Sequence, residues 1–261
     1  MERVIFELEH VGYRYEGGIV GLADMTVQVR AKSAIAVLGP NGSGKSTLLK
    51  ILDGLYYPTE GEFRAFGERI TERKLADGSF NRFFRKNVGL LFQDADAQLF
   101  SPTVEDEIAF GPRQLGLDNG AIKSRVDEVI AILGIEELRD RYPYSLSGGE
   151  KRKVALGSIL ALDPQVYLLD EPTANLDPKT EDKLIDLILS LREKEKTLIM
   201  ATQNPAFAAH VAKRFLLMDQ NKQLAAFGDK EEILADSDLL NRLGLLRTHR
   251  EIHEIINSYI T

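Results

Sequence analysis

Residues Ile35–Leu49 read IAVLGPNGSGKSTLL. An apolar run of strand length comes first, three glycines follow, and a lysine with two hydroxyl side chains opens an apolar helix. This is the phosphate-binding P-loop pattern, Gly39-x-x-x-x-Gly44-Lys45-Ser46, with the strand and the helix that the pattern requires on either side. The alternative is a glycine-rich turn before a helix, but average residue usage gives such a match by chance in only about 3 of 100,000 windows.

The residue types in this stretch suit the phosphates of a nucleotide. Glycines let backbone N–H groups turn inward and approach phosphate oxygens closely, and the helix aims its positive end at the same anion. Lys45 is expected to reach the β- and γ-phosphates, and the Ser46 hydroxyl suits Mg²⁺. The loop residues expected to bind ATP are Gly39, Pro40, Asn41, Gly42, Ser43, Gly44, Lys45, Ser46 and Thr47.

The bulk composition excludes several classes of protein. The chain has 261 residues, 44% of them hydrophobic, a formal net charge of −7 and no cysteine. An acidic balance argues against sequence-independent nucleic-acid binding, and the lack of cysteine excludes disulfides and cysteine-bound metals. No apolar run approaches the roughly 20 residues that span a bilayer, and the start of the chain lacks a secretory apolar region. We therefore expect a soluble chain that relies on another protein for any membrane span.

Alternation of apolar runs and helical patterns predicts an α/β fold with a parallel sheet. The segment 70–86, polar and basic, is interpreted as a solvated loop. A helical stretch after Gln93 interrupts the alternation and is expected to form its own lobe, with Thr103 capping a helix. Strands are predicted at 4–15, 25–29, 61–66, 88–92, 166–170, 197–201 and 215–218, and helices at 47–55, 122–133, 147 onward, 180–195, 206–214, 229–234 and 239–259.

Two adjacent acids, Asp170 and Glu171, follow the apolar run 166–169. In open α/β sheets, ligands bind at the carboxyl ends of the strands. Asp170 is therefore expected to hold Mg²⁺ and Glu171 to orient or deprotonate the attacking water. The alternative, two solvated acids at a strand end, loses weight because a P-loop stands in the same chain and phosphoryl transfer needs both groups.

The segment Leu146–Glu150, LSGGE, resembles the signature motif of ATP-binding-cassette ATPases. Ser147 and Glu150 have capping-box spacing, and two glycines at a helix start expose N–H groups to an anion. Other matches, in chain order, are Tyr15 for the adenine-stacking aromatic, Gln93 for the Q-loop glutamine and Mg²⁺ ligand, Asp170 and Glu171 for Walker B and the catalytic acid, and Asn175-Leu176-Asp177 for the D-loop.

The resemblance covers nearly the whole chain and implies a fold and a mechanism. It implies a P-loop NTPase core of RecA-like type with an antiparallel β subdomain at 1–93 and 147–228, a helical lobe at 94–146, and a C-terminal helical extension at 229–261. It also implies that two cassettes, identical or different, enclose two ATP molecules. Each ATP then lies between one P-loop and the opposite subunit's Ser147, Gly148, Gly149 and Glu150.

The segment Phe92–Pro112 is similar to the cassettes of energy-coupling-factor importers and cobalt or nickel importers. That likeness implies ATP-driven import of a vitamin or a transition metal ion through separate integral membrane subunits. It places the chain at the cytoplasmic face of the membrane as a peripheral subunit. Leu99 and Phe100 are either exposed beside Gln93 or part of the core of the helical lobe.

Two positions depart from the family pattern. Gln203 stands where such cassettes carry a switch histidine, and Lys153 stands where an arginine is usual. An amide can hydrogen-bond a γ-phosphate but cannot carry a proton or a charge. We hypothesise that Gln203 senses the γ-phosphate while hydrolysis at this site is slow. Two alternatives are a nucleotide-gated regulatory cassette with residual hydrolysis and a soluble cassette with a nucleic-acid or ribosome role.

The end of the chain carries an apolar stripe at helical spacing and a pair of histidines four residues apart. The stripe is either core packing or a dimer contact. The pair, His249 and His253, could share a metal, but no third ligand is evident and two exposed histidines are the simpler interpretation. The stripe consists of Ile252, Ile255, Ile256 and Tyr259.

Overall fold

The computed structural model describes residues 2–174 and 176–245. A six-stranded sheet in the order β10-β9-β3-β8-β7-β6 forms its centre, and every neighbouring pair is parallel except β10 with β9. The P-loop strand β3 is central because it pairs with both β8 and β9. The bounds are β3 Ala34–Leu38, β6 Val88–Leu91, β7 Val166–Asp170, β8 Thr197–Thr202, β9 Arg214–Met218 and β10 Leu224–Asp229.

A smaller four-stranded antiparallel sheet has the order β2-β1-β4-β5. Its strands are β1 Val4–Arg14, β2 Val20–Arg30, β4 Glu60–Ala65 and β5 Glu68–Arg69. The predicted strand at 25–29 is therefore the second half of a longer strand. The α/β class, the parallel sheet and the antiparallel sheet predicted from the sequence are confirmed.

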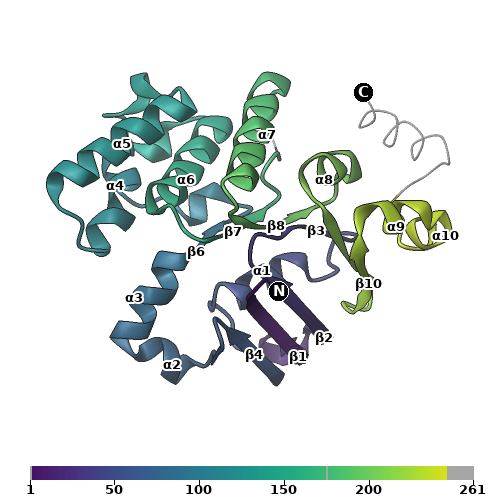
Figure 1. Ribbon diagram of the computed structural model, residues 1–261. Helices are drawn as coiled ribbons and strands as arrows, with labels where there is room; N and C mark the ends of the chain where they lie inside the picture. The colour runs from purple at the N-terminus through teal and green to yellow at the C-terminus, as the bar shows by residue number, and fades with distance from the viewer. Residues whose placement is uncertain (1, 175, 246–261) are drawn as a thin grey trace.

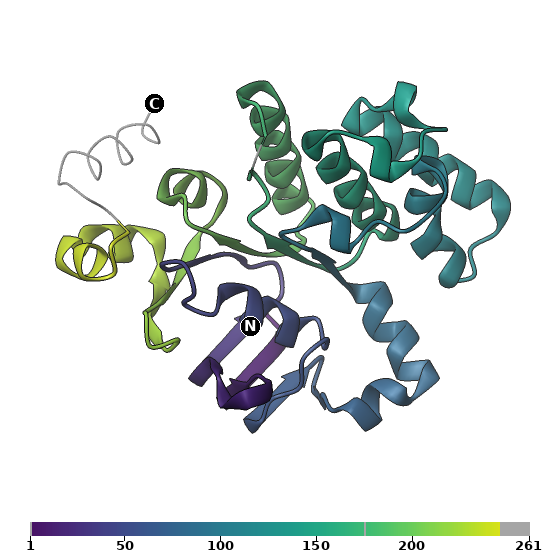
Figure 2. The same ribbon diagram turned by 180° about the vertical axis from the view of Figure 1, so that it is seen from behind.

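Helices and the small sheet cover opposite faces of the central sheet. Alternate residues of β3 show this directly, because Ala36 packs with the helices α6 to α8 and Val37 packs with α1 and the antiparallel sheet. The two views in Figures 1 and 2 show α1 between the two sheets and α4 to α8 on the far side. Two apolar cores thus hold the parallel strands, as expected for a sheet buried on both faces.

Most of the described helices begin at side-chain caps, with α1 and α9 as exceptions. Thr103, Asp118 and Ser147 accept hydrogen bonds from backbone N–H groups at the starts of α4, α5 and α6, so the predicted caps at Thr103 and Ser147 are confirmed. The α-helices are α1 Lys45–Leu52, α2 Glu72–Ala76, α3 Gly78–Asn87, α4 Val104–Gln114, α5 Asn119–Leu133, α6 Gly148–Leu162, α7 Pro178–Glu193, α8 Pro205–Val211, α9 Lys230–Ala235 and α10 Ser237–Arg242. Short 3₁₀ turns lie at Glu16–Gly18, Ala95–Ala97, Glu136–Leu138 and Pro143–Ser145.

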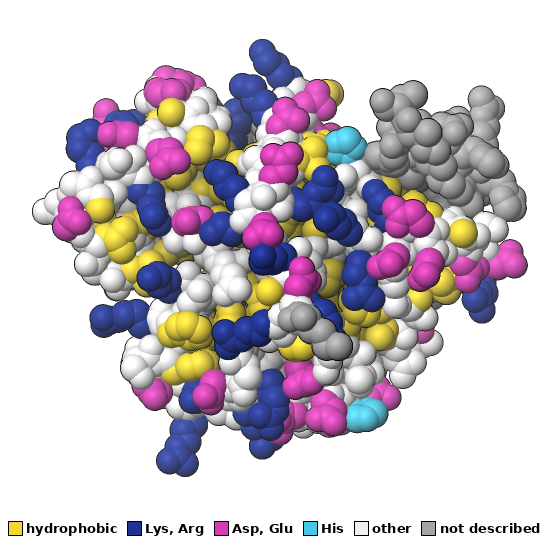
Figure 3. Space-filling view, in the orientation of Figure 1, with side chains coloured by type: hydrophobic (Ala, Val, Ile, Leu, Met, Phe, Trp, Pro, Cys, Tyr) yellow, Lys and Arg dark blue, Asp and Glu magenta, His cyan; other side chains and the backbone are white. Residues whose placement is uncertain are grey.

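The prediction of a solvated loop at 70–86 is wrong. Thr71 and Asp77 cap two helices there, and Leu75 and Phe84 are buried. The segment is short and basic, and its many charged residues hide the spacing of the few apolar ones in the sequence. The structure does show Lys and Arg side chains projecting from this segment beside hydrophobic ones (Figure 3). Burial of Phe84 against the core, rather than propensity, accounts for the helix.

Three further details bear on the sequence predictions. Leu99 is 1% exposed and belongs to the core, whereas Phe100 is 58% exposed. The strand β10 was not predicted, because its residues alternate only weakly. In the tail, α9 confirms the predicted helix at 229–234, and α10 ends at Arg242. The rest of the predicted helix at 239–259 lies outside the described residues, with the stripe at Ile252, Ile255, Ile256 and Tyr259 and the pair at His249 and His253.

None of the helices in the described part of the chain has the length and the apolar character that crossing a bilayer requires.

Candidate nucleotide site

The P-loop joins β3 to α1, and its glycines are required sterically. Gly44 has φ = 100°, and a Cβ there would lie 2.5 Å from the Gly21 carbonyl oxygen. A Cβ at Gly39 would lie 2.6 Å from the Met218 carbonyl oxygen. Other residues are therefore excluded at both positions, and the loop can turn backbone N–H groups toward an anion, while the N–H of Ser43 donates to the Pro40 carbonyl at 3.2 Å.

Lys45 is the first residue of α1 and is 7% exposed. Its ammonium donates hydrogen bonds to the carbonyls of Gly39 at 2.7 Å and Pro40 at 3.2 Å. Burial lowers the pKa of Lys45, and the carboxylates of Glu171 and Asp170 act in the opposite direction. A desolvated ammonium held over the loop is well placed to pair with phosphate oxygens.

Asp170 ends β7 and is 4% exposed. Burial raises the pKa of its carboxyl, while a hydrogen bond with Ser46 acts in the opposite direction. Within the described residues, Asp170 Oδ1 and Glu171 Oε1 are buried without a hydrogen-bond partner. Buried carboxylate oxygens without partners are costly unless a ligand satisfies them, and oxygen donors from a hydroxyl and carboxylates are the ligands that Mg²⁺ prefers. These residues therefore fit a magnesium ion.

Glu171 adopts a left-handed backbone conformation with φ = 46°. Its backbone N–H donates a hydrogen bond to the Ala201 carbonyl at 2.9 Å, which ties the end of β7 to β8. A non-glycine residue in this region is strained, and such strain persists where the surroundings hold it.

Tyr15 lies at the edge of the same site and is 36% exposed. Its hydroxyl shares a hydrogen bond of 2.7 Å with the hydroxyl of Thr47, and its ring meets Tyr13 edge-to-face at 5.0 Å and Tyr56 at 5.9 Å. These contacts fix the ring, so an aromatic face is held beside the P-loop where a base can stack.

One pocket brings most of the predicted residues together. Gln93 follows β6, and Gln203 follows β8 with an exposed side chain. Both lie at the carboxyl ends of neighbouring strands beside β7, as the sheet order requires. The residues that line this pocket are Tyr15, Ile19, Val20, Gly21, Asn41, Gly42, Ser43, Gly44, Lys45, Ser46, Thr47, Gln93, Asp170, Glu171, Gln203 and Lys222.

The signature residues do not line this pocket. Ser147 and Glu150 form the predicted capping box, with Ser147 N–H donating to Glu150 Oε2 at 2.8 Å, and these hydrogen bonds lower the pKa of Glu150. Gly148 is exposed and Gly149 is half-buried. The start of the 15-residue helix α6 therefore leaves its positive end outside the pocket that the P-loop lines.

Asp177, predicted to lie in the D-loop, also lies outside the pocket. It caps α7, accepting hydrogen bonds from the Thr180 backbone at 3.1 Å and from the Thr180 hydroxyl at 2.7 Å, and these bonds lower its pKa. Asn175 lies outside the described residues.

Sequence reasoning missed the two charged side chains Lys222 and Arg152. Lys222 lies in the turn before β10, lines the pocket and donates a hydrogen bond to the Val20 carbonyl. Arg152 is 5% exposed and contacts the carboxyl ends of β6 and β7. Its position three and seven residues before buried Ala155 and Ile159 is the signal that could have indicated an inward-facing charge.

The fold and the site together define a P-loop nucleotide hydrolase that binds ATP with Mg²⁺. Comparison with known proteins gives the family: the model of the ABC transporter family matches residues 22–174. The chain belongs to this family, in which ATP hydrolysis is coupled to transmembrane transport and the cassette works with membrane subunits and a second cassette.

Two relatives and one solved structure are similar to the chain over most of its length. A nickel import ATP-binding protein, NikO, from Rhodobacter capsulatus is 44% identical, covering 92% of this chain and 95% of its own. An energy-coupling factor transporter ATP-binding protein, EcfA, from Methanoculleus marisnigri is 42% identical, covering 92% and 85%. The structure of cbiO1 from Clostridium perfringens, part of the ABC transporter complex cbiONQ, has 29% identity and a TM-score of 0.76, covering 98% of this chain and 100% of its own.

Proposed function

We propose that this chain is the ATPase of an importer for a transition metal ion such as nickel or cobalt, or for a vitamin, and that it lies at the cytoplasmic face of the membrane. The pocket that unites the P-loop, Asp170 and Glu171 is the observation that carries the ATPase assignment. The likeness to the nickel import and energy-coupling factor cassettes supports the class of substrate.

The pocket residues that the sequence predicts as site residues have proposed parts in hydrolysis. The P-loop N–H groups and Lys45 bind the phosphates, and Tyr15 stacks on the adenine. Ser46, Gln93 and Asp170 would hold Mg²⁺, which supplies charge neutralisation at the β- and γ-phosphates. The Glu171 carboxylate accepts a hydrogen bond from the attacking water and takes its proton, while the Gln203 amide donates to a γ-phosphate oxygen.

The exposed start of α6 supports a dimeric reaction. Gly148 and Gly149 present N–H groups on a different surface from the pocket, so one chain alone offers only half of the phosphate contacts. We propose that a second cassette, identical or different, places its Ser147 to Glu150 over the ATP of this chain. Binding of ATP would close the dimer and hydrolysis would reopen it.

An aromatic patch on the helical lobe is the proposed contact for the membrane subunits. Phe100 and Phe110 are 58% and 41% exposed, with ring centroids 4.8 Å apart. Tyr142 and Tyr144 are also exposed, and backbone hydrogen bonds join their segment to the start of α4. Exposed aromatic clusters of this kind mark interaction sites.

Replacing Phe100 with glutamate should abolish co-purification with the membrane subunits while leaving ATP binding within about twofold, because a charge in an apolar contact is not tolerated. The matched control is Ile132→Glu, since Ile132 is 51% exposed on the same lobe but lies outside this patch. Equal retention of membrane partner by both variants would disprove the contact.

The importer assignment is tested by expressing the chain with the integral membrane subunits that co-purify with it and measuring ATP-dependent uptake of nickel, cobalt and labelled vitamins in vesicles. Uptake of one of them, lost when Lys45 is replaced by alanine, is the expected result. Retention of RNA or DNA at moderate salt without any membrane partner would favour the nucleic-acid alternative instead.

Gln203 favours a second candidate function, a nucleotide-gated cassette with slow hydrolysis. Gln203→His restores a group that can carry a proton beside the γ-phosphate and should raise the turnover number by about threefold or more, with ATP affinity little changed. Steady-state phosphate release checks this. A variant that hydrolyses no faster than the parent would contradict a limiting role for Gln203.

A further inference from the structure

Arg152 projects from the signature helix α6 into the core, where its guanidinium meets the ends of two strands. The acceptors are five main-chain carbonyls from the Q-loop start and from the end of β7. Nη1 donates to Phe92 O at 2.7 Å and Gln93 O at 2.7 Å. Nη2 donates to Asp170 O at 2.8 Å and to Glu171 O, and Nε donates to Pro172 O at 3.4 Å.

Burial of the Arg152 guanidinium removes its hydration, and its hydrogen bonds and charged neighbours must offset that cost. Desolvation lowers the pKa of Arg152, while the carboxylates of Asp170, Glu171 and Asp94 act in the opposite direction. A planar guanidinium presents five donors in a fixed fork, and here carbonyls on both sides of the fork receive them. Lysine cannot reproduce that geometry because its ammonium is a single point with three donors.

The same guanidinium restrains the backbone of Glu171. Glu171 is in the left-handed region at φ = 46°, and its carbonyl accepts from Arg152 while its N–H donates to Ala201. These two bonds hold both peptide groups of a strained residue. The direction of the Glu171 carboxylate, and therefore the position of a bound water, depends on that backbone.

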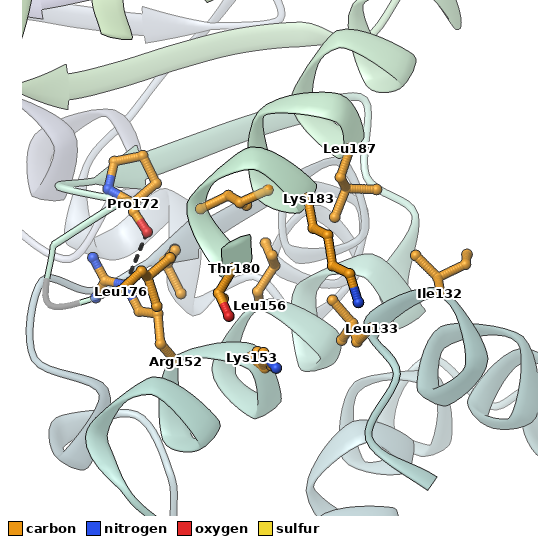
Figure 4. A pocket seen from close by; sticks show the side chains of 12 residues that line it. Ile132, Leu133, Arg152, Lys153, Leu156, Pro172, Leu176, Thr180, Lys183 and Leu187 are labelled. Carbon is orange, nitrogen blue, oxygen red and sulfur yellow. Dashed lines mark hydrogen bonds between the residues drawn. The ribbon is translucent and has the colours of Figure 1, made fainter. Parts of the chain in front are cut away.

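Apolar packing between the lobe and the core is incomplete beside Arg152. A cavity lined by Leu156 on α6 and by Pro172, Leu176 and Leu184 adjoins the guanidinium, and Figure 4 shows Arg152 and its bond to Pro172 at one side of it. Apolar contact between α6 and α7 is therefore incomplete at this point. The hydrogen bonds of Arg152 to the strand ends form the polar link between α6 and Glu171.

We propose that Arg152 is a positioning residue that fixes the Glu171 backbone and so makes the direction of the catalytic carboxylate depend on the position of α6. This rests on the proposed role of Glu171 as base. The signature glycines lie about one helical turn from Arg152 on the same helix. Contact between α6 and the nucleotide of a second cassette thus reaches the Glu171 of this chain.

The first test compares Arg152→Met and Arg152→Lys with the parent in the intact chain. Arg152→Met should lower the ATP turnover number about 20-fold or more, because a misplacement of about 1 Å in a reacting group can cost up to 100-fold, while ATP affinity changes by less than about threefold. Arg152→Lys, which keeps the charge but not the fork, should retain about a fifth of the parent rate.

The matched control is Arg125→Met. Arg125 also donates to α6 carbonyls, those of Ala161 and Leu162, but at the other end of the helix. A merely structural role would lower the thermal midpoint and the turnover of both variants alike. A turnover number of Arg152→Met within twofold of the parent, or a loss matched by Arg125→Met, would overturn the proposal.

The second test places Arg152→Met in a Glu171→Gln background and measures single-turnover hydrolysis. If Arg152 acts through Glu171, the double variant is slower than Glu171→Gln by less than twofold, whereas independent effects multiply. If the rate losses of the two substitutions multiply in full, the positioning role of Arg152 is refuted, while the proposed role of Glu171 as base is unaffected. A parent rate unaffected by Glu171→Gln would instead refute the proposed role of Glu171, so the two failures are distinguishable.

Discussion

Glu171→Gln is expected to lower the ATP turnover number about 100-fold or more, while the affinity for ATP changes by less than about threefold. The amide has the shape of the carboxylate but cannot accept the proton of the attacking water. The phosphate contacts of the P-loop and Lys45 are untouched, because they come from β3 and α1 rather than from the end of β7.

Phosphate release and nucleotide binding, measured on the same preparation, check this expectation. The proposed cycle, in which the closed dimer opens only after hydrolysis, predicts that the variant also elutes as an ATP-dependent dimer on size exclusion. The matched control is Glu181→Gln on α7, whose side chain lies away from the pocket. Turnover of Glu171→Gln within tenfold of the parent would move the role of base to another residue.

The features that could be predicted from the sequence are those whose residues lie together in one short stretch of the chain. The P-loop needs its glycines for local steric reasons, and β7 and β8 are continuous apolar runs that suit only a buried strand, so the site at their ends could be placed. The segment 72–87 could not be read in this way, because its helices depend on burying Leu75 and Phe84 against residues far away in the sequence.

Arg152 shows a second limit of sequence reasoning. Its five acceptors are backbone carbonyls at 92–93 and 170–172, which carry no signal in residue type. They become neighbours only because β6 pairs with β7 in register, Leu91 opposite Leu169. A side chain that binds main chain across a sheet is therefore found from coordinates, while a side chain that binds phosphate within a motif is found from sequence.

Arg85→Met is expected to lower the free energy of unfolding by about 3 kcal/mol at pH 8 and by only about 1 kcal/mol at pH 5.5. Arg85, on α3, donates through Nη1 to the carbonyl of Asp53 at 2.8 Å and to its Oδ2 at 2.8 Å, and Asp53 ends the P-loop helix with 5% exposure. Burial raises the pKa of Asp53 from 3.8 to about 6, against the lowering effect of Arg85.

The sign of the pH dependence follows from that raised pKa. A carboxyl whose pKa is higher in the folded state adds stability below 3.8, and this contribution, about 3 kcal/mol, is lost as the pH rises through about 6. Removing Arg85 raises the pKa of Asp53 further. The stability that the protonated carboxyl contributes is then lost over a range that extends to higher pH. At pH 5.5 the carboxyl is largely protonated in the folded variant, and mainly the hydrogen bond to the Asp53 carbonyl is missing.

Urea unfolding of the parent and the variant between pH 5.5 and pH 8 measures the difference, and two controls isolate its cause. In an Asp53→Asn background the extra loss at pH 8 should vanish, because no buried charge is left without its partner. Arg82→Met, an exposed arginine on the same helix, should change stability by less than about 0.5 kcal/mol at either pH. A loss for Arg85→Met that is equal at both pH values would contradict a change in the charge of Asp53 between pH 5.5 and pH 8, and would leave pH-independent contacts, such as the hydrogen bond from Arg85 to the Asp53 carbonyl, as the source of the loss.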